Sequence, residues 1–326
     1  MAGMGTNILA IAGGVGGAKL ALGLSRVLGP EELTVVVNTG DDETFHGLHV
    51  SPDLDTVTYA LAGMTNPETG WGIRGDTFRT LEALGRLGAE TWFRLGDVDL
   101  ATHVRRTELL RAGRSLSEVT RELTVHLGIP HAVVPMSDER VRTVALTDEG
   151  ELAFQDYFVK RGSEPRITGV RFDGARSARP SPGFAAALES ADAIVFCPSN
   201  PIVSIGPVLA VHGVSEAIES FGGPRIAVSP IVGGKALRGP AAKMMAELGD
   251  EVSCAGVARR YAGVCDALVI DTMDATEAPA IEALGMRALV TPTVMNTDAD
   301  KVALAREVVG FVEAWSPEPT RASRRG

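Results

Sequence analysis

The chain has few aromatic residues, few cysteines and no excess of positive charge. Aromatic residues make up 5% of its 326 positions, and the formal net charge at pH 7 is −10. This acidic balance argues against nucleic acid as the main partner, because phosphate backbones are bound by lysine and arginine. No apolar run approaches 18 residues, and the N-terminus lacks a basic segment followed by a long apolar one. We therefore expect neither a membrane span nor a signal peptide.

Cysteine is equally scarce. The three cysteines, Cys197, Cys254 and Cys265, have neither the spacing of a disulfide framework nor that of a metal site. This usage fits a reducing compartment, and we expect a cytoplasmic protein. Cys197 lies on an apolar strand, where a buried thiol is expected, and no serine stands in a nucleophile-elbow pattern.

Hydrophobic residues are plentiful, at 45% of the chain, and they gather in short runs. Most runs are followed by polar or glycine-rich residues and then by a helical pattern, which predicts a parallel sheet covered on both faces. The fold class expected is therefore α/β, with a Rossmann-like, mostly parallel sheet. Its predicted strands are Ile8–Ala12, Thr34–Val37, Ala193–Cys197, Arg225–Val228, Ala267–Ile270 and Ala288–Thr291.

The middle of the chain departs from this alternation. Residues 76–129 have a helical pattern, with Ser115 as an expected N-cap, and are interpreted as a helical insertion. Arg140–Leu146 and Leu152–Lys160 alternate across a turn at residues 148–150, which predicts a β-hairpin. Residues 1–75 and 130–315 then form the nucleotide-binding body. The Pro-, Arg- and Ser-rich tail, residues 316–326, is expected to be disordered.

The first strand ends in a glycine-rich turn, within the sequence NILAIAGGVGGAK. Gly13, Gly14, Gly16 and Gly17 allow a sharp turn and expose backbone N–H groups at the start of a helix, where an anion is favoured. The turn does not match Walker A, and the second strand lacks the acidic end of a dinucleotide fingerprint. It is either a phosphate-binding turn or a tight turn that needs glycine only for packing.

Loops that follow the other predicted strands strengthen the phosphate interpretation. In an open α/β sheet, ligands bind outside the carboxyl ends of the strands. Glycine, small polar or charged residues occur after four of the strands, so these loops predict one nucleotide site. Ser199, Asn200, Gly233, Gly234 and Lys235 belong to two of them.

Two acidic clusters flank the loop after the second strand. Asp41 and Asp42 form the first, and Asp53 and Asp55 the second. Carboxylates beside phosphates usually hold Mg²⁺, so we expect a magnesium site with one carboxylate activating an acceptor hydroxyl. The alternatives are a solvated acidic loop, or capping of the next helix by Asp53 or Asp55.

Arg94 and a histidine pair are the remaining candidates. Arg94 follows Trp92 and Phe93, which suits an anionic or planar ligand, although an arginine lying over the two rings on the surface explains the pattern equally well. His46 and His49 are three residues apart, but no third ligand at suitable spacing supports a transition-metal site.

Taken together, these segments resemble the 2-phospho-L-lactate transferase family (CofD, called FbiA in actinobacteria). The matching segments are spread over residues 7–310, and they read IAGGVGGAKL, VVNTGDD, SPDLDTVTYALAG, WFRLGDVDLATHVRR, CPSNPIVSIGPVLA and VSPIVGGKALRGPAAKM. The resemblance implies transfer of a phospholactyl-type group from a guanosine diphosphate conjugate to the deazaflavin Fo. The products would be GMP and coenzyme F-420 without its glutamate tail, with Mg²⁺ required. Such enzymes are typically dimeric.

The resemblance also implies roles for individual residues. Asp55 and Arg94 would contact the deazaflavin. Asp41, Asp42 and Asp53 would serve the metal and the ribityl hydroxyl, without a division of labour between them. The guanosine diphosphate would be held by Gly13, Gly14, Gly16, Gly17, Ser199, Asn200, Gly233, Gly234 and Lys235.

Two other functions compete with this one. The first is a non-catalytic nucleotide-sugar-binding regulator of the YvcK group, which shares the fold and the glycine-rich opening; the SPDLDT and WFRLGD segments favour the enzyme. The second, an NAD-dependent dehydrogenase, is set aside because the acidic ribose contact is missing. The three-carbon acid on the donor is left open among lactate, enolpyruvate and glycerate.

Overall fold

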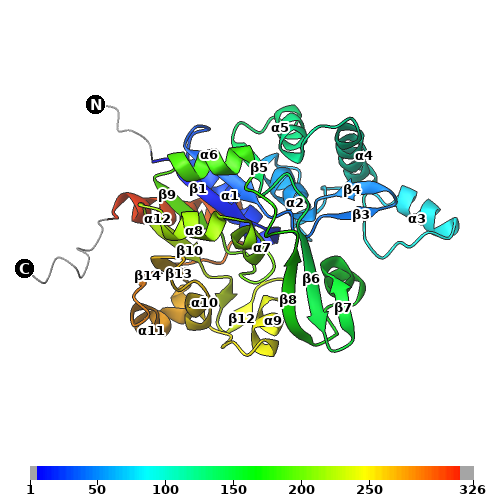
Figure 1. The fold of residues 1–326 in the computed structure, drawn as a ribbon. Coiled ribbons are helices and arrows are strands. Elements are labelled where there is room, and N and C mark those ends of the chain that lie inside the picture. The colour runs from blue at the N-terminus through cyan, green and yellow to red at the C-terminus, as the bar shows by residue number, and fades with distance from the viewer. Residues whose placement is uncertain (1–5, 316–326) are drawn as a thin grey trace, which may run out of the picture.

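The computed structural model describes residues 6–315, so the tail predicted to be disordered lies outside the described residues. Its centre is a seven-stranded sheet in the order β14-β13-β10-β9-β1-β2-β5 (Figure 1). All neighbouring strands run parallel. The strands are β1 (Ile8–Ala12), β2 (Leu33–Val37), β5 (Ala132–Pro135), β9 (Ala193–Phe196), β10 (Arg225–Val228), β13 (Ala267–Ile270) and β14 (Arg287–Val290). The predicted Rossmann-like sheet is confirmed.

Alternate side chains of each strand belong to two separate cores. In β1, Leu9 and Ile11 pack on one face, and Ile8, Ala10 and Ala12 pack on the other. All five residues are fully buried. Burial of both faces explains why the strands are continuous apolar runs rather than alternating ones.

Helices cover both faces of this sheet (Figure 1). Helix α1 packs against both α12 and α2. The helices of the body are α1 (Gly14–Val27), α2 (Pro52–Leu61), α6 (Pro182–Ser190), α7 (Gly206–Ala210), α8 (Val214–Glu219), α9 (Ala241–Glu247), α10 (Cys254–Arg260), α11 (Ala278–Glu282) and α12 (Asp298–Glu313), with a 3-10 helix at Thr272–Glu277. Within residues 6–315, no helix is long and apolar enough to cross a membrane.

The predicted helical insertion consists of α3 (Arg79–Arg86), α4 (Asp97–Arg111) and α5 (Leu116–His126). Ser115 caps α5 as predicted: its side chain accepts from the Glu118 N–H, and the Glu118 carboxylate accepts from the Ser115 N–H. This reciprocal capping box satisfies two N–H groups of the helix end.

The predicted hairpin is present, but it belongs to a three-stranded antiparallel sheet, β7-β6-β8. Its strands are β6 (Arg142–Thr147), β7 (Gly150–Ala153) and β8 (Ile167–Asp173). The predicted extension of the second strand to Lys160 is wrong, because Asp156–Lys160 is a π-helix. Phe154 stacks on Phe158 with ring centroids 5.6 Å apart, which is the side-chain spacing of a helical turn rather than of a strand.

Several short strands were not predicted from the sequence. Strand β5 forms an edge of the central sheet and ends in Pro135, a residue that edge strands tolerate. Two further hairpins are formed by β3 (Glu43–Phe45) with β4 (Leu48–Val50), and by β11 (Ile231–Val232) with β12 (Lys235–Ala236). Both hairpins follow strands of the central sheet and lie toward its carboxyl end.

Strand order reverses at β1, which has β2 on one side and β9 on the other. Loops after these strands diverge there, and the resulting crevice is the usual ligand position in such folds. The glycine-rich turn and the turn that begins at Pro198 are therefore neighbours.

Candidate functional site

A cavity of about 1030 Å³ occupies this crevice. Its walls come from the loops after β1, β2, β9 and β10, from the helical insertion and from the segment after β7. Nine of the predicted site residues line it: Gly13, Gly14, Gly16, Asp41, Asp53, Asp55, Arg94, Ser199 and Asn200. The other five, Gly17, Asp42, Gly233, Gly234 and Lys235, do not line it.

The glycines of the turn are required by close contacts and by backbone conformation. A Cβ on Gly16 would lie 2.2 Å from the Pro198 carbonyl oxygen, and one on Gly17 would lie 2.5 Å from Ser199 Oγ. Gly14 has a φ of +62°, which favours glycine. Packing of this turn against the Pro198 loop is therefore confirmed. The interpretation as a phosphate site depends on what else faces the cavity.

The start of α1 faces the cavity. Gly13 is its N-cap residue and has no side chain, and the Asp53 carboxylate accepts from the Gly14 N–H. Ser199 Oγ accepts from the Gly13 N–H at 3.0 Å and donates to the Gly13 carbonyl at 2.9 Å, which fixes the turn. Free N–H groups at the positive end of a helix favour phosphate.

Two cations that had no predicted role face the cavity beside this helix end. Lys19 donates to the Met295 carbonyl at 2.6 Å, and Arg238 donates to the carbonyls of Thr69 and Glu68. Neither cation forms an ion pair with a carboxylate within residues 6–315. Burial first, and then the positive charge of Arg238, lowers the pKa of Lys19. An anion bound between these two cations would relieve their repulsion.

Asp41 and Asp53 face the same cavity and share one amide. Asn38 Nδ2 donates to Asp53 Oδ2 at 2.9 Å and lies 3.2 Å from Asp41 Oδ2. Asn38 Oδ1 accepts from the Gly40 N–H, which fixes the orientation of the amide. The two aspartates therefore converge, although they come from the end of β2 and from the first turn of α2.

The pKa values of this pair are raised. Burial and then the negative charge of Asp53 raise the pKa of Asp41 well above its usual range, and burial raises that of Asp53 to about 6. Asp41 Oδ1 is buried without a hydrogen-bond partner. Oxygen atoms of two converging carboxylates, one of them unpartnered, match the ligands that Mg²⁺ prefers. These residues therefore fit a divalent cation.

Asp42 points to different partners. Its Oδ2 accepts from Ser51 Oγ at 2.7 Å and lies 3.0 Å from His49 Nε2. His49 thus has a carboxylate partner. Of the two adjacent aspartates, Asp41 alone lines the cavity. Neither Asp53 nor Asp55 is the N-cap residue of α2. Ser51 occupies that position, and the two aspartates lie in the first turn of the helix.

Asp55 is part of a buried polar network. Both of its carboxylate oxygens accept from the Arg106 guanidinium. His103 Nδ1 lies 3.6 Å from Asp55 Oδ2, and its Nε2 lies 3.2 Å from Asp99 Oδ1, which also accepts from the Tyr59 hydroxyl at 2.6 Å. Asp55 therefore reaches the cavity as a carboxylate already neutralised by Arg106.

An aromatic cluster forms the opposite wall. Phe45 and Phe93 are stacked with centroids 4.1 Å apart, and Trp92 packs edge-on against both rings. Arg94 lines the cavity, but its guanidinium lies over the ring of Phe78, 4.1 Å from the centroid, rather than over the neighbouring rings. Of these three rings, Trp92 and Phe93 line the cavity, and such aromatic side chains suit a flat ring system.

The loops after β9 and β10 contribute unequally. Asn200 lines the cavity, and its Oδ1 accepts from the Ile202 N–H at 2.9 Å. Gly233, Gly234 and Lys235 instead form the turn of the β11–β12 hairpin, where the Gly233 N–H donates to both oxygens of Asp274 at 3.0 Å. The proposed phosphate contact of Lys235 stays a prediction.

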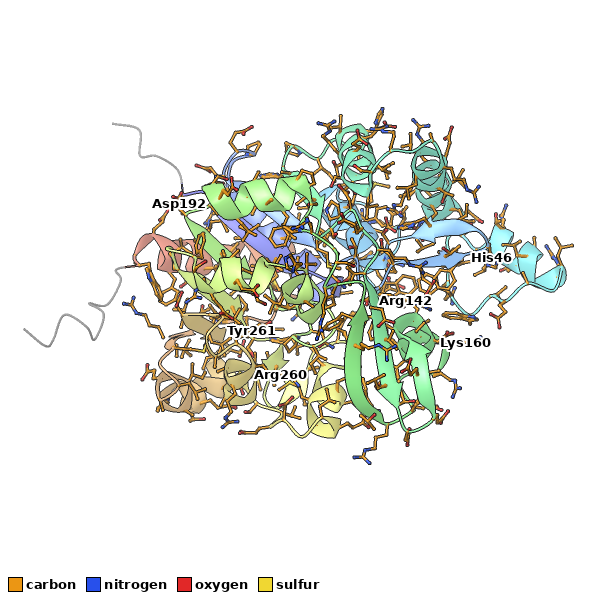
Figure 2. The ribbon with its side chains drawn as sticks, in the orientation of Figure 1. His46, Arg142, Lys160, Asp192, Arg260 and Tyr261 are labelled. Carbon is orange, nitrogen blue, oxygen red and sulfur yellow. The ribbon has the colours of Figure 1, made fainter. Side chains whose placement is uncertain are left out.

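A second cavity of about 550 Å³ adjoins the first, and Trp92, Phe93 and Gln155 line both. Figure 2 shows Arg142 and Lys160 on the antiparallel part, toward the side of the molecule where His46 lies. Lys160 forms an ion pair with Glu90 at 2.9 Å, and Arg142 lies 3.4 Å from Glu43. Both cations of the second cavity therefore have a carboxylate partner.

Sequence reasoning did not find Lys19, Tyr59, His103, Arg106 or Arg238. A signal existed for two of these residues. In α4, Asp99, His103 and Arg106 recur at the spacing of one helix face, and all three are buried. Polar residues at positions where an amphipathic helix normally places apolar ones indicate a buried polar network. The other contacts depend on tertiary proximity and leave no local pattern.

Comparisons with known proteins agree with this geometry. The sequence model of the family described as "2-phospho-L-lactate transferase CofD" matches residues 8–307. A phosphoenolpyruvate transferase of Streptomyces griseus is 44% identical, covering 94% of this chain and 98% of its own length. A 2-phospho-L-lactate transferase of Methanopyrus kandleri is 41% identical, covering 95% of this chain and 99% of its own length.

A solved structure supports the fold. The crystal structure of a UPF0052 family member from Bacillus halodurans aligns with a TM-score of 0.62 at 16% identity, covering 94% of this chain and all of that one. At this identity the likeness shows the fold alone. The family match over nearly the whole chain and the two curated relatives show that the chain belongs to the CofD family and is a transferase.

Proposed function

We propose that the protein transfers a phospholactyl-type group from a guanosine diphosphate conjugate to the ribityl hydroxyl of the deazaflavin Fo. GMP leaves, and the product is coenzyme F-420 without its glutamate tail, or the dehydro form. One observation carries the proposal. A single cavity is lined by the N-terminal end of α1, a pair of converging carboxylates and aromatic side chains.

The donor half would lie at the glycine-rich turn. The N–H groups at the start of α1 and the cations of Lys19 and Arg238 would hold the diphosphate. The GMP phosphate gains negative charge as the phosphorus–oxygen bond breaks, so cations fixed beside it stabilise the leaving group. Ser199 supports this half by fixing the backbone of Gly13.

The acceptor half would lie between the aromatic wall and the Asp55 network. Trp92 and Phe93 would offer a surface for the flat deazaflavin ring, and Arg94 and Asp55 line the same cavity. The Tyr59, Asp99 and His103 side chains hold the Asp55–Arg106 pair from behind. These contacts fix the acceptor so that its hydroxyl reaches the phosphorus.

Asp41 and Asp53 would hold Mg²⁺, which supplies positive charge to the phosphate oxygens when it is bound. A carboxylate of this pair also accepts the proton that the ribityl hydroxyl loses as it attacks. The donor's phosphorus–oxygen bond to GMP breaks as the new bond forms, so atoms and charge balance. Asp42 would contribute indirectly, by anchoring the loop that carries Asp41 to Ser51 and His49.

The test uses purified protein with Fo, Mg²⁺ and each of three guanosine diphosphate conjugates, carrying lactate, enolpyruvate or glycerate. We expect GMP release together with a new deazaflavin product, and chromatography of that product identifies the preferred acid. Relatives at similar identity are named for both phosphoenolpyruvate and 2-phospho-L-lactate, so the name of a relative does not choose between them. Binding of a UDP-sugar without GMP release would instead support the regulator alternative.

A further inference from the structure

Two loops from distant parts of the sequence meet above the glycine-rich turn. One is residues 63–75, between α2 and α3, and the other is residues 233–239, between β11 and α9. Arg238 joins them by donating to the carbonyl oxygens of Thr69 and Glu68. Gly70 approaches the first turn of α1 so closely that a Cβ would lie 2.7 Å from Val15 Cγ1. The tip of residues 63–75 therefore lies against the first turn of α1.

The base of the second loop is firmly held. The Gly233 N–H donates to both carboxylate oxygens of Asp274, and Ser229 Oγ accepts from the Ile231 N–H at 3.1 Å. Cys254 Sγ adds a contact to the Ile231 carbonyl at 3.3 Å. Arg238 thus extends from an anchored hairpin.

The first loop is closed at its base by backbone contacts. The Met64 N–H donates to the Tyr59 carbonyl at 2.8 Å, the Arg74 N–H donates to the Met64 carbonyl at 2.8 Å, and Thr65 and Ile73 form an antiparallel bridge. Above this base, the Arg238 contacts to Thr69 and Glu68 tie the tip of the loop to the hairpin.

The guanidinium of Arg238 has donors to spare. An arginine side chain carries five N–H groups, and the two carbonyl contacts occupy two of them. Its partners are neutral, it forms no ion pair within residues 6–315, and it shares the cavity with Lys19. A phosphate would be a stronger partner than either carbonyl, because both members of the contact would then be charged.

We propose that Arg238 binds the diphosphate of the donor and at the same time ties residues 63–75 closed over it. The identity of the ligand rests on the proposed function, whereas the tie rests on the contacts described above. Because one guanidinium holds both partners, binding is coupled to closure: the donor stabilises the closed loop, and the closed loop tightens donor binding to the same extent.

The test measures GDP affinity by calorimetry and backbone hydrogen exchange with and without saturating GDP. Wild type, Arg238→Ala and Arg238→Lys are compared with Arg121→Ala, which alters an exposed arginine of α5 outside the cavity. We expect GDP to slow exchange in residues 63–75 of wild type and of the control. Arg238→Ala should bind GDP about tenfold more weakly and lose the slowing even at saturation. Arg238→Lys should recover part of the affinity without the slowing.

Arg238 is exposed, so these variants should keep the fold. Unchanged GDP affinity in Arg238→Ala, or full slowing of exchange in that variant at saturation, would overturn the proposal. So would equal exchange of residues 63–75 in free and GDP-bound wild type. Failure of wild type to bind GDP at all is a different result, and it would reject the proposed donor itself.

Discussion

A single amide holds the two carboxylates at the centre of the site. Asn38 uses Oδ1 for the Gly40 N–H and Nδ2 for Asp53 and Asp41, so its side chain aligns both acids toward the cavity. One N–H₂ group does not neutralise two buried carboxylates, and burial raises both pKa values. A divalent cation bound here would relieve the repulsion between the two carboxylates.

The first prediction concerns Asp53 and pH. In the folded protein its pKa is about 6, against a usual value of 3.8, so between these values the folded state holds more protons than the unfolded one. The free energy of unfolding therefore falls as pH rises from about 4 to about 6, and the loss persists at higher pH. We expect Asp53→Asn, which carries no charge, to raise the melting temperature of the metal-free protein at pH 7.5 by about 2 °C or more.

The metal provides the second half of that experiment. Mg²⁺ should raise the melting temperature of wild type at pH 7.5 and have little effect at pH 4.5, where Asp53, with a pKa of about 6, is mostly protonated. Asp53→Asn should lose this response, while Asp138→Asn, a change far from the cavity lining, should keep it. A wild-type melting temperature that ignores Mg²⁺ at both pH values would contradict the assignment of a metal site.

The second prediction compares two neighbouring arginines of α4. Arg106 is buried and donates to both oxygens of Asp55, whereas Arg105 is exposed and pairs with Glu108 and Glu122. Removing one partner of a buried pair leaves an uncompensated charge, so Arg106→Leu should lower the free energy of unfolding by about 3 kcal/mol or more. Arg105→Leu should cost less than about 1 kcal/mol. Urea unfolding measures both, and equal effects would refute the structural role of the buried pair.

At the scale of elements, the glycine-rich turn depends on how closely α1 approaches the loop after β9. Gly16 leaves no room for a side chain, because a Cβ would lie 2.2 Å from the Pro198 carbonyl oxygen. The third prediction is that Gly16→Ala displaces the start of α1, lowers the free energy of unfolding by about 1–3 kcal/mol and weakens GDP binding. Calorimetry and urea unfolding measure the two effects.

A glycine elsewhere gives the matched control. Gly310, inside α12, has nothing within 4 Å of its Cβ position, so Gly310→Ala should stabilise the protein by about 0.5–1 kcal/mol and leave GDP binding unchanged. If Gly16→Ala bound GDP as tightly as Gly310→Ala does, the close approach would matter for packing only.

Elements with strong local patterns were predictable from the sequence. The strands of the central sheet other than β5 were placed to within one residue, because their apolar runs are continuous; most of these strands are buried on both faces, whereas the edge strand β14 is only partly buried. Strand β8 escaped notice, since Gly169 and alternating charges interrupt it. The segment at Asp156–Lys160 alternates like a strand but folds as a π-helix, because Phe154, Gln155 and Tyr157 are all buried on one side.

The site was predictable where it depends on strand order and not where it depends on side-chain direction. Pooling the loops at one edge of the sheet correctly placed Gly13, Asp41, Ser199 and Asn200 around a single cavity. Adjacent aspartates could not be told apart, because only the fold turns Asp41 inward and Asp42 toward Ser51. Lys235 and Arg238 are three residues apart, and the hairpin alone decides which of them reaches the cavity.

On the scale of the whole molecule, the cavity lies between three parts of the chain. The Rossmann-like body supplies the glycine-rich turn and the carboxylate pair, the helical insertion supplies the aromatic wall, and the segment after β7 supplies Phe154 and Phe158 (Figure 1). Lys160 links the last two parts through Glu90 and lies 5.3 Å from the Trp92 ring centroid. The proposed donor half therefore lies in the body, whereas the proposed acceptor half combines the insertion with Asp55 of the body.

This division yields the last prediction, that the two halves of the cavity can be weakened separately. Lys19→Met should weaken GDP binding about tenfold and leave Fo binding unchanged, because Lys19 lies beside the helix end. Trp92→Ala should weaken Fo binding about tenfold and leave GDP binding unchanged, because it removes part of the flat wall. The double variant should show both losses with no coupling beyond about 0.5 kcal/mol. Trp315→Ala, outside the cavity, is the control; loss of GDP affinity in Trp92→Ala would show that donor and acceptor share this wall.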